Sequence, residues 1–166
     1  MTKEKKIIIV ISSIACVLLL LSGFLIFRSC NQNEPNTPSS LPQDSNAVDW
    51  NGNQQLPGVS VPSGKICIPG FDSLVFTAGK TNQKVNFYNP ALNGDRVFIM
   101  TLFIENKEYW KSGYCPSNSG YYDIELSEPL AEGEYLGYLK IQVFKPDGTE
   151  LNGAKVEFNL TVVKEK

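Results

Sequence analysis

The feature that most constrains this chain is a run of 21 residues near its start, residues 7–27, that contains no charged side chain. An α-helix rises about 1.5 Å per residue, so roughly 20 apolar residues cross the hydrocarbon core of a bilayer. Lys3, Lys5 and Lys6 precede the run, and basic flanks tend to stay in the cytoplasm. We therefore predict that 7–27 is a single transmembrane helix in contact with the lipid bilayer of the cell membrane. Residues 1–6 would be a cytoplasmic tail, and the C-terminal part would be extracellular.

Two other fates of this segment are open. A cleaved signal peptide usually has an apolar region of only about 7–15 residues, followed by small residues. Here the bulky Phe27 and the charged Arg28 stand where a signal peptide would have those small residues. In a lipoprotein, Cys30 would carry the lipid, but Arg28 lies two positions before it. We expect an uncleaved signal anchor, so the function should lie outside the cytoplasm.

Composition changes abruptly over residues 28–64, which are rich in Asn, Gln, Pro and Ser and poor in large apolar residues. Such a segment cannot bury enough surface to offset its chain entropy, so we predict a disordered linker. Val48 and Trp50 are its one apolar pair, which either docks on the folded part or stays exposed. The remaining residues, 65–166, have the usual size of one domain.

Apolar residues within 65–166 alternate with polar ones, which is the period of a β-strand with one buried face. Residues 97–104 are apolar on both faces, as in a central strand. Turn signals such as Pro146-Asp147-Gly148 and Asn152-Gly153 separate the alternating stretches. We predict an all-β, immunoglobulin-like (Ig) or fibronectin-III-like antiparallel β-sandwich of about seven or eight strands. The alternating positions are Leu74 and Phe76; Val85 and Phe87; Phe98, Met100, Leu102 and Ile104; Tyr122, Ile124 and Leu126; Tyr135, Leu139, Ile141 and Val143; and Val156, Phe158, Leu160 and Val162.

One local motif sharpens the fold prediction. Leu130, Gly133 and Tyr135 stand before a long alternating stretch. This arrangement resembles the tyrosine corner of immunoglobulin and fibronectin-III sandwiches, in which the tyrosine hydroxyl bonds to the backbone a few residues upstream. Tyr135 could instead be an ordinary strand aromatic, which would leave the fold class unchanged.

The stretch from about residue 68 to the end resembles a group of small, membrane-anchored surface proteins of Gram-positive bacteria. These are often encoded within mobile elements or beside large surface proteins, and their activity is uncharacterised. The resemblance implies fold and location and transfers no catalytic residue, because the shared motifs are turn and packing motifs. They are Ile68-Pro69-Gly70-Phe71, Phe87-Tyr88-Asn89-Pro90 with Asn93, Lys111-Ser112-Gly113, Leu130 to Tyr135, and Leu151-Asn152-Gly153-Ala154.

Three cysteines lie outside the predicted membrane segment. An exported domain permits disulfides, and Cys67 with Cys115 is the only pair inside 65–166. Sequence does not reveal whether their Cα atoms approach within about 7 Å, as a bridge requires, so a bridge and two unpaired cysteines are both open. Cys30 is left over and could stay a free thiol, carry an acyl group or pair with a second chain.

Composition disfavours most catalytic and cofactor chemistry. The chain has no histidine, which removes the commonest general base and most zinc sites. It has neither CxxC spacing nor a glycine-rich phosphate loop. Residues 65–166 contain 11 basic and 13 acidic residues, so nucleic acid is not an expected partner. Asp123 and Glu125 alternate with apolar residues and should lie on a solvated strand face. We expect no enzyme activity, metal or cofactor.

The remaining candidate for function is a concentration of aromatic residues, Tyr109, Trp110, Tyr114 and Tyr121, together with Tyr122. Some of these rings should fill the sandwich, Trp110 and Tyr122 in the simplest case, and the others could form a binding surface. The preferred hypothesis is a non-enzymatic, membrane-tethered, extracytoplasmic interaction module. It would hold a protein partner through a sheet edge or this surface, as an accessory of a bacterial surface, secretion or conjugation assembly. The alternative is a carbohydrate-binding module that recognises a cell-wall or host glycan.

Overall fold

The computed structural model describes residues 41–52, 64–71 and 73–165. The predicted cytoplasmic tail, transmembrane helix and Cys30, and much of the predicted linker, lie outside the described residues. Among the residues described, no helix is long and apolar enough to cross a membrane. Contacts divide the chain into two units, Met1–Pro38 and Ser39–Lys166. The described residues all belong to the second unit.

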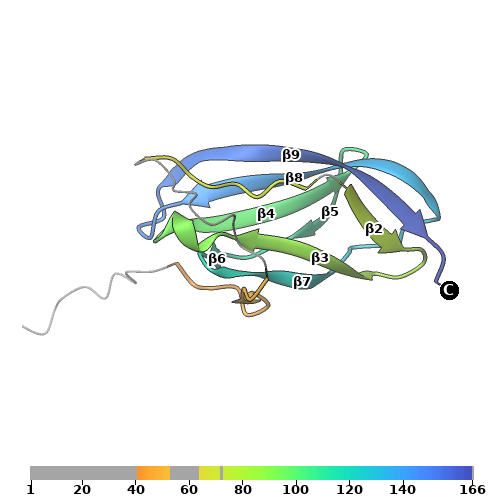
Figure 1. Ribbon diagram of the computed structural model, residues 1–166, viewed down its shortest axis with the longest axis horizontal. Coiled ribbons are helices and arrows are strands. Elements are labelled where there is room, and N and C mark those ends of the chain that lie inside the picture. Colours follow the sequence, from red (N-terminus) through yellow and green to blue (C-terminus); the bar gives the residue numbers. More distant parts are fainter. Residues whose placement is uncertain (1–40, 53–63, 72, 166) are drawn as a thin grey trace, which may run out of the picture. The chain divides into compact units, whose positions relative to one another are not determined.

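This unit is all-β, as predicted (Figure 1). Its one helical element in the described part of the chain is a short 3-10 turn, Ala91–Asn93. The strands are β1 (Val48–Asp49), β2 (Ser73–Thr77), β3 (Asn82–Asn89), β4 (Val97–Ile104), β5 (Lys107–Lys111), β6 (Cys115–Pro116), β7 (Ser119–Glu125), β8 (Gly133–Phe144) and β9 (Glu150–Val163).

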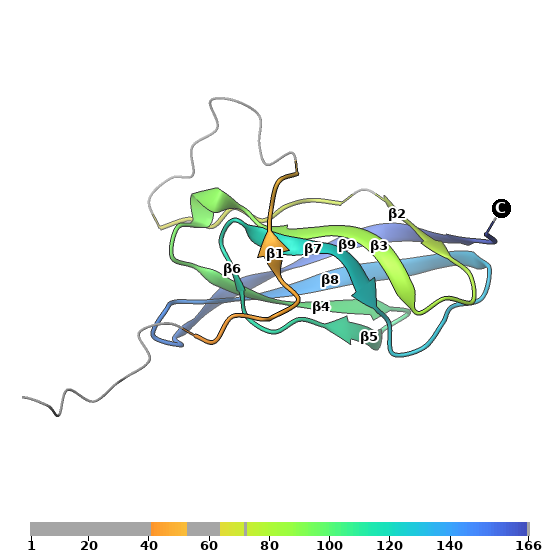
Figure 2. The same cartoon turned by 90° about the horizontal axis from the view of Figure 1, so that it is seen from below.

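The strands form two sheets. The small sheet has the order β1-β7-β3, and the large sheet has the order β2-β9-β8-β4-β5, with β6 also paired to β4. Figure 2 shows the small sheet in front of the large one. All pairs are antiparallel except β2 with β9, which run parallel. The β8–β9 hairpin turns at Pro146-Asp147-Gly148, where Gly148 adopts φ 84°, as its turn signal predicts.

The inward side chains of both sheets fill one core between them. Strand alternation brings them there, and most of the positions predicted from the period-two pattern are fully buried. Leu74, Tyr135 and Val156 are half-buried. Tyr122 is the one exposed position among them, while its neighbour Tyr121 is buried. The alternation of β7 breaks where its pairing with β3 shifts register between Lys84 and Phe87. The fully buried core side chains include Phe76, Phe87, Phe98, Met100, Leu102, Ile104, Leu139, Ile141, Val143, Leu160 and Val162.

Residues 41–52, here called the docked segment, lie against the small sheet. Its strand β1 pairs with the start of β7, and the backbone N–H of Trp50 donates to the backbone carbonyl of Asn118 at 2.9 Å. Trp50 is buried, whereas Val48 is exposed. The domain boundary expected at residue 65 thus differs from the structure. A short strand pairing and one buried indole hold a polar segment that composition alone assigns to a linker.

The turn expected at Asn152-Gly153 is also wrong, because both residues lie inside β9. Pairing between β8 and β9 shifts register there, between Ile141 and Val143. The same residue types that favour turns also favour bulges. A β-carbon on Gly153 would lie 2.2 Å from the Ile141 carbonyl oxygen, so the close backbone approach requires glycine.

Candidate functional site

The structure separates the four aromatic residues predicted to form one surface. Trp110 and Tyr121 meet edge to face, with ring centroids 5.0 Å apart. Tyr109 instead directs its hydroxyl at a carboxylate in the loop after β7, at 3.2 Å. Tyr114 packs on an aromatic ring at the end of β8. Of the four predicted residues, Trp110 and Tyr121 are therefore the two whose rings are in contact.

These two residues line a groove of about 460 Å³, here called the edge groove. It lies between the docked segment, β5 and β7, where an edge of the small sheet faces an edge of the large one. Its rim is predominantly acidic. The lining residues are Asp44, Ser45, Asn46, Val48, Asn82, Trp110, Lys111 and Tyr121 to Glu125.

Asp44 anchors one end of the edge groove. Its carboxylate accepts hydrogen bonds from the Tyr121 hydroxyl at 2.9 Å, the Gly113 N–H at 2.7 Å and the Asn46 N–H at 2.9 Å. Partial burial by itself raises the pKa of the Asp44 carboxyl, but these hydrogen bonds to the charged form outweigh it, and the net pKa is lowered. Burial raises the pKa of the Tyr121 hydroxyl, the nearby Cys115 and Asp44 adding to the shift, so Tyr121 stays a neutral donor to Asp44.

The edge of β7 that borders the groove is open beyond β1. The Leu126 N–H bonds to the Thr81 carbonyl at 2.9 Å, on the β3 side. Because backbone groups alternate along a strand, the N–H and C=O groups of Asp123 and Glu125 point to the opposite side. There β1 reaches only Ser119 and Gly120, and just past the strand the Ser127 N–H donates to the Tyr109 carbonyl of β5 at 2.8 Å. The open stretch is therefore short and lies at Asp123 and Glu125, where no other strand in the described part of the chain pairs with this edge of β7.

Trp50 lies flat on the outward face of the small sheet, between two tyrosines. Its ring is stacked 4.6 Å from Tyr88 and 4.6 Å from Tyr122, with interplanar angles of 5° and 12°. Two glycines make room for it. A β-carbon on Gly120 would lie 2.9 Å from the indole, and one on Gly52 would lie 2.5 Å from it. This stack holds the docked segment, and sequence reasoning did not find it.

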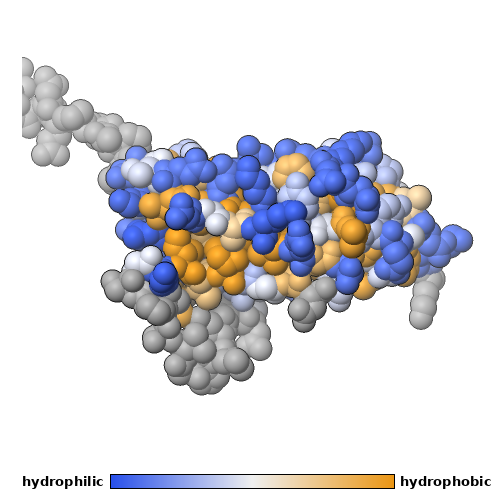
Figure 3. All heavy atoms as spheres, turned by 90° about the horizontal axis from the view of Figure 1, so that it is seen from above, coloured by the Kyte–Doolittle hydropathy of each residue, from blue (hydrophilic) through white to orange (hydrophobic). Residues whose placement is uncertain are grey.

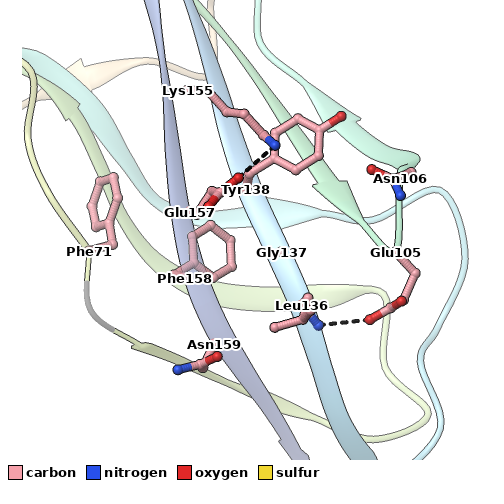
Figure 4. A pocket seen from close by; sticks show the side chains of 10 residues that line it. All are labelled: Phe71, Glu105, Asn106, Leu136, Gly137, Tyr138, Lys155, Glu157, Phe158 and Asn159. Atoms are coloured by element: carbon pink, nitrogen blue, oxygen red, sulfur yellow. Dashed lines mark hydrogen bonds and ion pairs between the residues drawn. The ribbon is translucent and has the colours of Figure 1, made fainter.

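A second hollow lies on the outward side of the large sheet, here called the face trough. One part, of about 510 Å³, is lined by Glu105, Leu136, Tyr138 and Asn159 among others (Figure 4). A further part, of about 560 Å³, continues along β8 and β9 and shares Tyr138 and Lys155 with the first. On this side of the molecule, hydrophobic surface shows between hydrophilic residues (Figure 3). Sequence patterns predicted no cavity here.

The rim of the face trough contains a backbone conformation that is uncommon for its residue types. Glu105 and Asn106 form the β4–β5 turn with φ of 49° and 65°, as a two-residue hairpin of this kind requires. Asparagine tolerates this region well and glutamate does not. The Glu105 carboxylate compensates by accepting the Leu136 N–H at 2.8 Å, a bond that is drawn in Figure 4.

The two cysteines of the described part are not joined by a disulfide. Asn89 and Asn93 link their backbones instead. Asn93 pairs with both backbone groups of Cys67, at 2.8 and 2.9 Å, and donates to Asn89 at 2.8 Å, while Asn89 donates to the Cys115 carbonyl at 3.0 Å. Burial raises the pKa of the Cys115 thiol to about 12, which makes it a poor nucleophile.

The predicted tyrosine corner has a matching geometry. The Tyr135 hydroxyl donates to the Ala131 carbonyl, four residues upstream, at 3.0 Å. Gly133 lies under the ring, where an added β-carbon would lie 3.4 Å from it. Leu130 is buried in the core. These three residues therefore act in packing.

Asp123 and Glu125 lie on the solvated strand face that the sequence predicts for them. Asp123 is paired with Lys84 at 3.4 Å, and Glu125 accepts the Thr81 hydroxyl at 3.0 Å. Both are exposed on the outer face of the small sheet. Among the described residues, no group of three or more cysteine, aspartate or glutamate side chains is placed to hold a metal ion.

Comparison with known proteins adds no assignment: no protein-family model matches the chain, and no curated protein matches it.

Proposed function

We propose that this chain is a non-enzymatic binding module, tethered to the cell membrane by residues 7–27, that captures an extended strand of a protein partner outside the cell. The resemblance noted from the sequence is our basis for proposing that such a module works beside a surface, secretion or conjugation assembly of a Gram-positive bacterium. The observation that carries the proposal is the open edge of β7 beside the edge groove.

The strand order supports an Ig-like sandwich. Immunoglobulin sheets follow the orders ABED and CFG. In this chain β3-β7-β1 corresponds to B-E-D, and β4-β8-β9 corresponds to C-F-G. The D position is filled only in part, by two residues that come from before the rest of the sandwich in the sequence. The slot beside Asp123 and Glu125 is the remainder of that position.

An extended peptide added to a sheet edge gains affinity from backbone hydrogen bonds and specificity from side-chain pockets. The slot supplies the N–H and C=O groups of Asp123 and Glu125, and Trp110 and Tyr121 line the groove beneath it. Asp44 adds a further carboxylate, while Lys111 is the one basic residue of the lining. We therefore expect a partner strand that carries lysine or arginine between apolar residues.

The edge can be blocked without disturbing the fold. Asp123→Pro removes one N–H that points to the open side and leaves the β3 pairing of the neighbouring residues in place, as proline is tolerated at a sheet edge. Asp123→Ala removes the same carboxylate but keeps the N–H. It is the matched control.

The test is crosslinking in intact cells that express the full chain, with mass spectrometry of adducts formed at Lys111. We expect a single partner protein whose adduct is lost with Asp123→Pro and kept with Asp123→Ala, both variants resisting protease as the parent does. Equal capture by all three chains would contradict edge binding.

A further inference from the structure

The face trough is built around Tyr138, whose ring forms a rigid wall. On the β4 side, Phe103 stacks on the ring with centroids 4.8 Å apart and an interplanar angle of 11°. On the other side, the Lys155 ammonium lies 4.2 Å from the ring centroid and forms an ion pair with Glu157 at 2.7 Å. Figure 4 shows the ammonium in front of the ring.

Hydrogen-bonding side chains flank this wall. The side-chain amides of Asn106 and Asn159 make no hydrogen bond within the described part of the chain, and Figure 4 places them on either side of Leu136. Each amide offers two donors and an acceptor. Glu105 and Glu157 add carboxylate acceptors. The trough thus combines an aromatic ring with both hydrogen-bond donors and hydrogen-bond acceptors.

The charges of the face trough nearly cancel. Lys155 and Lys140 stand against Glu105, Glu150 and Glu157. A polyanion would meet more carboxylates than ammonium groups there, and a polycation would meet the ammonium groups of Lys155 and Lys140. The occupant that fits is uncharged.

A peptide is a poorer fit because the trough crosses a sheet face. The backbones of β8 and β9 are already paired with each other through this region, as in Leu136 with Asn159 and Tyr138 with Glu157. No backbone groups remain there for an added strand. Recognition must come from side chains, and the partner must offer many hydroxyl groups together with a face that stacks on an aromatic ring.

We propose that the face trough binds a linear, uncharged polysaccharide chain. One sugar ring lies against Tyr138, on the side now covered by Lys155, and its hydroxyl groups bond to Asn106, Asn159 and Glu157. Lys155 is half-exposed, and the sugar ring takes the place of its contact with Tyr138. The two parts of the trough, of about 510 and 560 Å³, extend from Tyr138 in opposite directions along β8 and β9, so several consecutive sugars bind better than one.

The test uses the full chain in phospholipid nanodiscs, because glycoside detergents would compete for the site. Cellohexaose, chitohexaose, maltohexaose and xylohexaose are titrated by calorimetry, each beside its monosaccharide. We expect at least one hexasaccharide to bind and its monosaccharide to bind at least about tenfold more weakly. Loss of the stacking ring in Tyr138→Ala should weaken binding about tenfold or more, and loss of an amide in Asn159→Ala should weaken it severalfold.

Three variants separate this site from others and from misfolding. Tyr138→Phe keeps the ring and should bind nearly as well as the parent. Tyr114→Ala removes an aromatic outside the trough, and Asp123→Pro blocks the β7 edge; both should leave saccharide binding unchanged, even if the protein-partner proposal fails. Absence of binding to all four hexasaccharides overturns the proposal. So does binding that persists in Tyr138→Ala, or binding that is lost with Tyr114→Ala.

Discussion

Replacing Trp50 with alanine should release the docked segment from the small sheet. The indole is 5% exposed and contacts Tyr88 and Tyr122 on both of its faces. Truncating a buried tryptophan typically costs about 3–5 kcal/mol of unfolding free energy. Because this site lies at the surface, where water can enter, we expect the lower end, about 3 kcal/mol. Val48→Ala, on the same segment but at an exposed position, should change stability by less than about 0.5 kcal/mol.

The assay is urea unfolding of the fragment 39–166, followed by circular dichroism. With a urea dependence of about 1–3 kcal/mol per molar, Trp50→Ala should lower the unfolding midpoint by roughly 1–3 M. Trp50→Phe keeps a ring between the two tyrosines and should recover more than half of this loss. If Trp50→Ala unfolds at the same midpoint as Val48→Ala, the stack contributes nothing and the reasoning fails.

Two further predictions concern hydrogen bonds. The lowered pKa of Asp44 means that its ionised form stabilises the fold at and above the unfolded-state value of about 4, and that this contribution is lost as the pH falls through the folded-state pKa. The stability difference between the parent and Asp44→Asn, measured by urea unfolding across pH, should therefore be constant near neutrality and shrink in acid. A difference that stays constant down to pH 2 would contradict a stabilising role of the ionised Asp44 carboxylate. Tyr135→Phe should lose the hydrogen bond to Ala131 and with it about 0.5–1.5 kcal/mol of unfolding free energy. An unchanged thermal midpoint would show that this hydrogen bond does not stabilise the fold.

Local periodicity was enough to predict the strands that build the core. Met100, Leu102 and Ile104 on β4, and Leu139, Ile141 and Val143 on β8, are buried where the period of two places them. This works because a residue's side in a strand depends only on its neighbours in sequence. The prediction failed at Tyr121 and Tyr122, where the register shift opposite β3 interrupts the period. That shift depends on the partner strand and leaves no trace in β7 alone.

The sites could not be predicted for a related reason. Trp50 is recognisable as an apolar residue in a polar stretch, but its partners Tyr88 and Tyr122 lie far along the chain and meet only through the pairing of β3 with β7. The face trough joins Glu105 in a turn to Tyr138 and Lys155 on two strands. Aromatic residues close in sequence, such as Tyr109 and Tyr114, were by contrast carried apart by the strand geometry.

The stacked indole also bears on how the protein should be produced. A recombinant fragment that begins at residue 65, where the composition suggests a boundary, would uncover the faces of Tyr88 and Tyr122 and lengthen the unpaired side of β7. Uncovered rings beside a free strand invite self-association in solution. A fragment that begins before residue 41 would keep Trp50 on both tyrosine rings and β1 paired with β7.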